Sequence, residues 1–559
     1  MIECSRSQSS STIHTDVDHN PRAMSRPRSF TESIKRSSMN QNTEPEYPSG
    51  NVINQSEKEE HTEGSSIEES IVKHRINKDM DLERGAKPES EDANRKTSTS
   101  DVKLVTWDGP DDSKNPKNWT LQQKWTAAII MSFFTLISPI SSSMVAPALE
   151  KMASDLEIHS DITLQLSLSV FVLAYAIGPL VLGPLSEIYG RLVVLQLANL
   201  FFLVFNIGCA TSQTKVQMII CRFFSGLGGS APMPEERGKS VAIYSLAPLL
   251  GPAVGPIAGA FIAEKTSWRW VFWSTSILDA VIAIVGIFFL RETYAPKILL
   301  NRARTLRKET GDNSYETEVE IQNKSKSLGQ RLGDAFVRPF RLLFTQPIII
   351  VLALYMAFVY GIMYLVLSTF PRLWTNPSYY NESVGIGGLN YISLGVGFFF
   401  GSQTCAPLND RIYRTLKARN AGVGNPEMRV PLMIVASVFV PAGLFIYGWT
   451  AEKHAHWIAP NIGTALFGIG VIMAFQCIQT YLVDAYTRYA ASALAAASVL
   501  RSLAGFCFPL FAPYMYDSLR FGWGNSVLAF ISIAVGVPAP LFLWRYGPVL
   551  RQKSPFAAG

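Results

Sequence analysis

The nine residues Gly183-Pro184-Leu185-Ser186-Glu187-Ile188-Tyr189-Gly190-Arg191 connect two long apolar runs, 162–184 and 192–210. A related stretch, Ala406-Pro407-Leu408-Asn409-Asp410-Arg411-Ile412-Tyr413-Arg414, follows the apolar run 384–406. Pro, Leu, an acid and the last Arg coincide in the two stretches. This internal repeat indicates a chain built from two similar halves, a plan typical of membrane transporters.

Apolar runs of this kind recur along most of the 559 residues, of which 48% are hydrophobic and only 17% charged. A helix of about 20 apolar residues is needed to cross the hydrocarbon of a bilayer. The sequence therefore predicts an all-α integral membrane protein with six spans in each half, on either side of a polar stretch, 291–345. The predicted spans are 125–147, 162–184, 192–210, 216–233, 241–263, 270–290, 347–370, 384–406, 430–450, 457–482, 491–515 and 524–545.

The remaining segments predict the domain plan. The first 103 residues are rich in Ser, Asn, Glu, Lys and Arg, and cannot bury enough apolar surface to order themselves. We expect them to form a disordered cytosolic tail without a signal peptide. The further expected parts are a membrane bundle (104–290), a cytosolic loop (291–345), a second membrane bundle (346–546) and a cytosolic C-terminal tail (547–559).

Loop charges predict the orientation, because Lys and Arg are more numerous in the links on the N-terminal side of the membrane. Both termini are then cytosolic. The sequon Asn381-Glu382-Ser383 falls in an outer loop, which makes Asn381 a candidate for glycosylation.

Several kinds of chemistry leave no signature in the sequence. The 6 Cys residues show no disulfide or zinc spacing, and there is neither a phosphate-binding loop nor a nucleophile elbow. The sequence thus predicts no enzyme activity, no metal, no cofactor, no ATP drive and no nucleic-acid partner. The expected partners are a small organic substrate, protons and the lipid bilayer, and we expect a monomer.

The repeated charged link is suited to a gate. Gly183 and Gly190 would allow close helix approach and a tight turn. Glu187 and Arg191 would pair with a neighbouring helix end in one conformation and release it in the other. Asp410 and Arg411 would act likewise in the second half, although such links can also serve only to set topology.

The predicted fifth span carries a second motif. Gly251, Gly255 and Gly259 recur every four residues, so that they share one helix face and permit tight packing. Pro252 and Pro256 are expected to kink this helix. Generic close packing is the alternative interpretation.

Four ionisable residues, which are costly inside a membrane, are candidates for proton coupling: Arg222, Asp279, Asp484 and Arg501. A buried Asp that faces a cavity can hold a proton until a nearby Arg displaces it. Intrahelical pairing or snorkelling would be the structural alternative. Polar and aromatic residues of the second half are candidates for lining a substrate cavity, namely Tyr355, Tyr360, Tyr364, Asn390, Tyr391, Gln476 and Gln479.

These motifs carry a family resemblance. The link at 183–191 matches G-x-L-x-(D/E)-x-x-G-R of the major facilitator superfamily, and Arg222 resembles its proton-coupling motif. The stretch 250–259 resembles its antiporter motif, except that Ala260 replaces the final Gly. From Trp107 onward the chain resembles fungal twelve-span drug:proton antiporters, on the stretches 107–119, 244–248, 290–296, 387–391, 481–486 and 508–513.

This resemblance implies two pseudo-symmetric six-helix bundles that rock around a central cavity. It also implies proton-coupled export of drugs, toxins or related compounds, mostly in the plasma membrane and sometimes in the vacuolar membrane. Polyamine export is an alternative, although it would be expected to need acidic residues in the cavity. A facilitator or proton symporter that imports a nutrient is a further alternative, which the stretch 250–259 disfavours.

The chain departs from the family at one place. Gly228–Met233 runs straight into Pro234–Gly238, whereas the family has about a dozen more residues between them. The fourth span is therefore shortened to about 18 residues, near the lower limit for crossing a bilayer. A transport-impaired membrane sensor is the corresponding alternative function.

Overall fold

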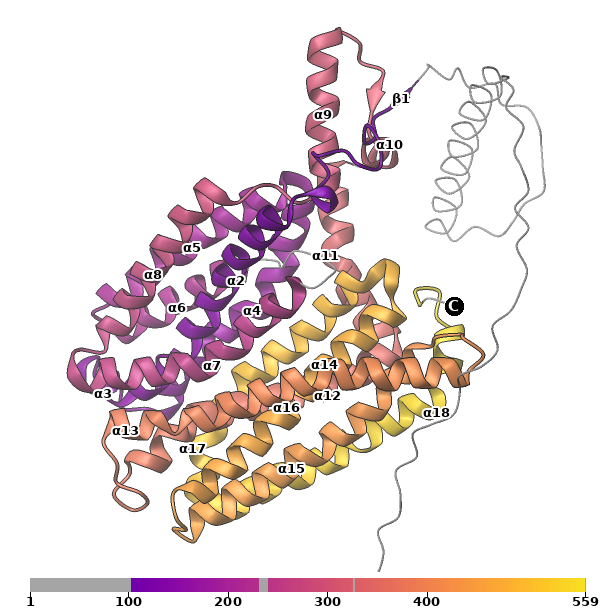
Figure 1. Cartoon of the computed structure of the whole chain (residues 1–559). Helices are drawn as coiled ribbons and strands as arrows, with labels where there is room; N and C mark the ends of the chain where they lie inside the picture. Colours follow the sequence, from indigo (N-terminus) through magenta and orange to yellow (C-terminus); the bar gives the residue numbers. More distant parts are fainter. Residues whose placement is uncertain (1–101, 231–239, 325–326, 558–559) are drawn as a thin grey trace, which may run out of the picture. The chain divides into compact units, whose positions relative to one another are not determined.

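The computed structural model describes residues 102–230, 240–324 and 327–557, and nearly all of them lie in helices (Figure 1). The predicted all-α membrane fold is confirmed. The expected N-terminal tail lies outside the described residues, apart from its last two.

Six long helices make up the first half of the membrane region within the described residues. The first, α2, is capped by Thr120, whose side chain accepts from the Gln123 N–H in a capping box. Helix α6 has only 15 residues, or roughly 22 Å at the usual helical rise, and the predicted end of the fourth span at residue 233 lies outside the described residues. The helices are α2 (Leu121–Ser143), α4 (Asp161–Tyr189), α5 (Arg191–Thr211), α6 (Lys215–Gly229), α7 (Ser240–Lys265) and α8 (Arg269–Phe289).

The second half repeats this arrangement. Arg520 interrupts the helical path of α17 with φ 55° and ψ −175°, so that this element consists of two helices that meet at a kink. Pro538, which has no N–H to donate, begins the last helix. The helices are α12 (Pro347–Thr375), α14 (Tyr391–Arg419), α15 (Val430–Glu452), α16 (Ile458–Ala485), α17 (Ala490–Gly536) and α18 (Pro538–Gln552).

The outer faces of these helices are apolar. On α8, the side chains of Ile277, Val281, Ile284 and Phe288 form one exposed stripe, and Phe288 is 77% exposed. Leaving such a stripe in water would forgo about 25 cal/mol for each Å² of apolar surface. Nine helical stretches of the described residues are long and apolar enough to cross a membrane, which is consistent with these stripes facing lipid.

The nine stretches differ from the twelve predicted spans for two reasons. The stretch Ala490–Gln552 continues through the kink at Arg520, so it contains both the eleventh and the twelfth predicted spans. The predicted spans 216–233 and 241–263, which correspond to α6 and α7, are not among the nine.

Short helices close the ends of the long ones. They are η2 (Ala146–Ala148) and α3 (Leu149–Asp155) after α2, α13 (Val384–Leu389) before α14, η3 (Pro426–Arg429) before α15, and η4 (Thr487–Tyr489) before α17.

Helix packing brings the two halves together along two seams. Within the first half α2 packs on α7, and α6 packs on α4 and α5; within the second half α12 packs on α17, and α15 packs on α16. Helix α4 of the first half lies along α17 of the second, and α7 lies along α13 and α14. Side chains of α2, α4, α12 and α17 therefore meet at the boundary between the halves.

The segment between the halves, predicted only as a loop, contains three helices: α9 (Ala295–Thr310), α10 (Glu318–Asn323) and α11 (Leu328–Thr345). Its strand β2 (Tyr315–Glu316) pairs in parallel with β1 (Lys103–Leu104), which precedes the first membrane helix. Asp312 accepts a hydrogen bond from the Ser314 N–H and forms an ion pair with Lys103 at 3.0 Å. The Ser314 hydrogen bonds and Lys103 lower the pKa of Asp312 to about 2.

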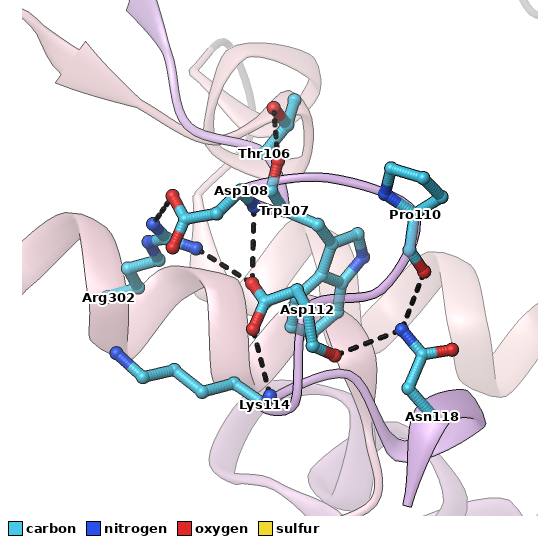
Figure 2. A network of polar contacts seen from close by, with 8 residues as sticks. All are labelled: Thr106, Trp107, Asp108, Pro110, Asp112, Lys114, Asn118 and Arg302. Atoms are coloured by element: carbon cyan, nitrogen blue, oxygen red, sulfur yellow. Dashed lines mark hydrogen bonds and ion pairs between the residues drawn. The ribbon is translucent and has the colours of Figure 1, made fainter.

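A second contact joins the same two segments (Figure 2). Arg302 of α9 forms ion pairs with Asp108 and with Asp112, the latter at 3.2 Å. The Asp112 carboxylate also accepts hydrogen bonds from the backbone N–H groups of Lys114 and Asp108, and these lower its pKa. The turn before 3-10 helix η1 (Pro116–Asn118) is held by Asn118, whose side-chain amide donates to the Pro110 and Asp112 carbonyls. Ion pairs and strand pairing thus join the segment before the first membrane helix to the segment between the halves.

Candidate transport site

Arg222 of α6 is fully buried inside the first half. Its guanidinium donates to the carbonyls of Ser141 at 3.1 Å and Ser142 at 3.4 Å, and to two carbonyls of α4, those of Ser167 and Leu168. Because α2 ends at Ser143, the Ser141 and Ser142 carbonyls lie in its last turn and lack intrahelical partners. The negative end of the α2 dipole therefore stabilises the Arg222 charge.

Aromatic rings complete the surroundings of Arg222. Its guanidinium lies 4.5 Å from the centroid of the Phe171 ring and 5.7 Å from that of Phe272. Arg222 forms no ion pair with a described residue, so its charge is balanced by carbonyl dipoles and ring faces.

Tyrosines of the second half meet this arginine region at the boundary between the halves. The Tyr364 hydroxyl of α12 lies 3.1 Å from that of Ser142 on α2, which is a hydrogen bond between the halves. Tyr175 of α4 bonds to Ser138 and lies close enough to Tyr360, Arg222 and Arg501 to interact electrostatically with each.

Arg501 of α17 is half-buried on the other side of these tyrosines. Its guanidinium lies 4.8 Å from the centroid of the Tyr360 ring, which in turn lies 4.9 Å from that of Tyr364. The Arg501 Nε–H is buried and has no hydrogen-bond acceptor among the described residues. We call Ser142, Tyr175, Arg222, Tyr360, Tyr364 and Arg501 the central polar cluster.

Asp279 is buried but lies elsewhere. It faces α5, where the Asn199 side-chain amide donates to its Oδ2 at 3.3 Å, while its Oδ1 has no partner among the described residues. Further along α5, the Asn206 side-chain amide donates to the hydroxyls of Thr275 at 2.8 Å and Ser276 at 2.9 Å, both on α8. Asp279 therefore belongs to a polar seam between α5 and α8 and lies outside the central polar cluster.

Asp484 also lies outside the cluster, at the end of α16. Arg429 donates to its Oδ2 at 2.9 Å and to Asp410 Oδ1 at 2.8 Å, and stacks on Tyr413. Asp484 and Asp410 thus share one arginine, whereas Arg411 lies on the exposed face of α14. The sequence indicated Arg429 only as one of many basic residues in the links between spans.

The repeated link of the first half also has a helix-end partner. Gly190 joins α4 to α5 with φ 101°, a conformation that favours glycine, and a Cβ there would lie 2.5 Å from Glu292 Oε2. That carboxylate accepts from the Leu192 N–H at 3.1 Å, and Arg191 stacks on Tyr294. A Cβ on Gly183 would meet nothing within 4 Å, so the close helix approach expected there is absent. Glu187 is near the end of α4.

The glycine motif of α7 packs directly on α2. A Cβ would lie 2.5 Å from Pro139 Cβ at Gly251, 2.8 Å from the Ile140 carbonyl oxygen at Gly255 and 2.1 Å from the Met144 carbonyl oxygen at Gly259. Helix α7 continues through Pro252 and Pro256. On its other side, Ala260 approaches Gly388 of α13, so α7 is held between the two halves.

Of the predicted cavity residues, only Tyr360 and Tyr364 belong to the central polar cluster. The Tyr391 hydroxyl donates to the Leu367 carbonyl within the second half, and a Cβ on Gly536 would pack against Tyr355. Asn390 donates to Glu382 and accepts from Asn461 near the start of α14. These three residues lie outside the central polar cluster. The last two predicted cavity residues lie on α16. Gln476 donates a hydrogen bond to Ser402 of α14, and Gln479 is exposed.

Sequence reasoning missed Tyr175 and Ser142. The available signal was a polar hydroxyl inside an apolar run, which is too common among packed residues to identify a site. Asn381 is exposed, as a glycosylation site requires.

Long apolar helices in two halves that meet around a polar cluster define a polytopic membrane transporter. A match to the Major Facilitator Superfamily covers residues 131–509, and the chain belongs to this superfamily.

Relatives of the chain include two proteins named as efflux pumps. The chain is 49% identical to "Efflux pump vrtL" of Penicillium aethiopicum over 86% of this chain and 96% of that protein. It is 42% identical to "Efflux pump radE" of Floropilus chiversii over 82% of this chain and 86% of that protein.

Solved structures share the fold. The xylose transporter XylE from E. coli, in a partially occluded inward-open conformation, has a TM-score of 0.55 and 16% identity, over 76% of this chain and 98% of that protein. Together with the superfamily match and these relatives, this fold shows that the chain is a multi-pass membrane transporter and not an enzyme.

Proposed function

We propose that this chain exports drugs, toxins or related small organic compounds by alternating access, driven by protons. The observation that carries the proposal is the 49% identity to a protein named an efflux pump, over nearly all of that protein's length. We place the exporter in the plasma membrane as a monomer with both termini cytosolic, with the vacuolar membrane as the alternative.

The central polar cluster supports alternating access. Its residues come from both halves. One hydrogen bond described above, from Ser142 to Tyr364 at 3.1 Å, links the halves within the cluster. Rocking of the halves would exchange this bond for bonds to substrate or water at a net cost of about 1 kcal/mol. A boundary of this kind can open without loss of either bundle core.

Buried charge supports proton coupling. Arg222 lies in the cluster without an ion pair to a described residue, and Asp279 keeps one carboxylate oxygen without a partner among them. Of these two groups only the carboxyl can exchange a proton, because a guanidinium stays charged, so we assign the coupled proton to Asp279 and a fixed positive charge to Arg222. We assign gating to the charged links around Gly190 and Asp410, whose partners are Glu292 and Arg429.

The test uses cells that lack their own exporters. They express either this chain or a version with about a dozen residues inserted between Met233 and Pro234, as the family pattern has, and efflux of fluorescent dyes is followed with and without a protonophore. Protonophore-sensitive efflux by the chain as written supports the proposal. Efflux by the lengthened version alone would identify this chain as transport-impaired, and protonophore-insensitive efflux would refute proton coupling.

A further inference from the structure

The central polar cluster carries positive charge that no described residue neutralises. Arg222 is balanced by four carbonyls, but among the described residues Arg501 has neither an ion pair nor a hydrogen-bond acceptor, and its Nε–H is buried. A guanidinium is planar and presents several N–H donors, a geometry that matches a carboxylate or another delocalised anion.

Carboxylates lie away from this charge. Asp279 faces Asn199 between α5 and α8, and Asp484 is paired with Arg429 at the far end of α16. An organic cation or a polyamine at the cluster would therefore meet like charge without a compensating acid among the described residues. Like charges at a binding site act against the wrong ligand as strongly as opposite charges favour the right one.

Aromatic faces adjoin the unpaired arginine. The ring centroids of Tyr360 and Tyr364 lie 4.9 Å apart with the rings tilted by 48°, and the Arg501 guanidinium lies over the Tyr360 ring. Phe475 continues the aromatic surface, with its ring centroid 5.7 Å from that of Tyr360. Conjugated rings pack favourably on such faces. The surface is thus suited to a flat ring system that carries an acidic group.

We infer that the transported compounds are aromatic or conjugated organic anions, whose carboxylate or phenolate is bound by Arg501 while their rings pack on Tyr360 and Tyr364. This inference rests on the proposed function, in that it names the substrate class of the proposed exporter. Arg501 is then a specificity-determining residue.

The test compares two dyes that share a xanthene ring system, the anion fluorescein and the cation rhodamine 123. Binding to the purified full-length protein in uncharged detergent micelles is measured by fluorescence anisotropy, with empty micelles as the blank. We expect tighter binding of fluorescein. Arg501→Gln should weaken fluorescein binding by about 10- to 100-fold, which is the range for losing a charged hydrogen bond, and should not weaken rhodamine binding.

Two further variants complete the design. Arg501→Lys, which keeps the charge, should restore part of the fluorescein affinity, and Arg545→Gln removes an exposed arginine of α18 as a matched control without effect. Tighter binding of rhodamine 123 by the wild-type protein, or unchanged fluorescein binding by Arg501→Gln, would overturn the inference. Because binding is measured without a gradient, a failure of the export proposal would leave this readout intact.

Discussion

At the scale of single residues, the chain places its buried charges in different kinds of environment. Arg222 is surrounded by carbonyls, Arg501 by tyrosine rings, Asp279 by an asparagine, and Asp484 by an arginine. The last of these is paired and lies at a helix end, so it is the least suited to binding substrate. Arg501 lies at the boundary between the halves, whereas Arg222 lies inside the first half and bonds to the turn that carries Ser142 to this boundary.

Arg222→Ala is predicted to reduce gradient-driven efflux by about tenfold or more, because the Ser141 and Ser142 carbonyls would lose the donor that holds α2 to α6. Dye efflux normalised to the amount of protein in the membrane is the measurement. Arg222→Lys keeps the charge but cannot reach the same four carbonyls, so it should recover only part of the rate. Wild-type efflux by the Ala variant would remove Arg222 from the mechanism.

Asp279→Asn tests proton coupling separately. The amide preserves an acceptor for Asn199 while it removes the titrating proton, so insertion into the membrane should be unaffected. If Asp279 carries a coupled proton, efflux driven by a pH gradient in proteoliposomes should fall by about tenfold. Retained efflux with the same pH dependence would show that the seam between α5 and α8 is structural only.

At the scale of elements, close backbone packing determines where α7 lies. Its glycine face contacts α2, and its opposite face contacts α13 and α14, so one helix is shared by both halves. Helix α6, in contrast, has only 15 described residues and is the shortest of the long helices in the described part of the first half.

Gly259→Ala is predicted to destabilise the protein by about 1–3 kcal/mol, because its Cβ would lie 2.1 Å from the Met144 carbonyl oxygen. Gly183→Ala is the matched control, since that position faces open space on a helix and alanine should be neutral or stabilising by up to about 1 kcal/mol. Thermal unfolding of the two purified variants provides the comparison. Equal melting temperatures would contradict the packing argument.

At the scale of the whole molecule, contacts at one end of the α7 seam hold the halves together. The Glu264 carboxylate accepts a hydrogen bond from the Gly385 N–H at 2.6 Å, and Ser383 lies 3.5 Å from the same oxygen. These bonds, together with the one from Ser142 to Tyr364, join elements that must separate when the halves rock. They are therefore expected to favour the conformation observed here.

Glu264→Ala is predicted to shift the conformational equilibrium away from the observed conformation by about 10- to 100-fold, the range for losing a charged hydrogen bond. A cysteine introduced at Ser142, in a variant without native cysteines, should then react faster with a membrane-impermeant maleimide. Glu150→Ala, which removes an exposed glutamate of α3, serves as the control. An unchanged labelling rate would show that Glu264 does not hold the seam.

Sequence alone determined the membrane class, the two-halved helical plan and the superfamily, because apolar length, loop charge and the repeated link are local properties of the chain. It could not determine which polar residues share a site. Tyr355 and Tyr360 look alike in one apolar run, yet the first packs inside the second half and the second lies beside Arg501. Helix rotation and packing between distant helices decide that difference.

Helix rotation and packing also explain why Asp279 and Arg222, both charged residues in apolar runs, have different surroundings. One face of α8 turns Asp279 toward α5, while α6 presents Arg222 to the last turn of α2. Only the tertiary structure brought Ser142, Tyr175 and Tyr364 to these arginines, because contacts between distant segments, such as the hydrogen bond from Ser142 to Tyr364 across 222 positions, leave no local pattern.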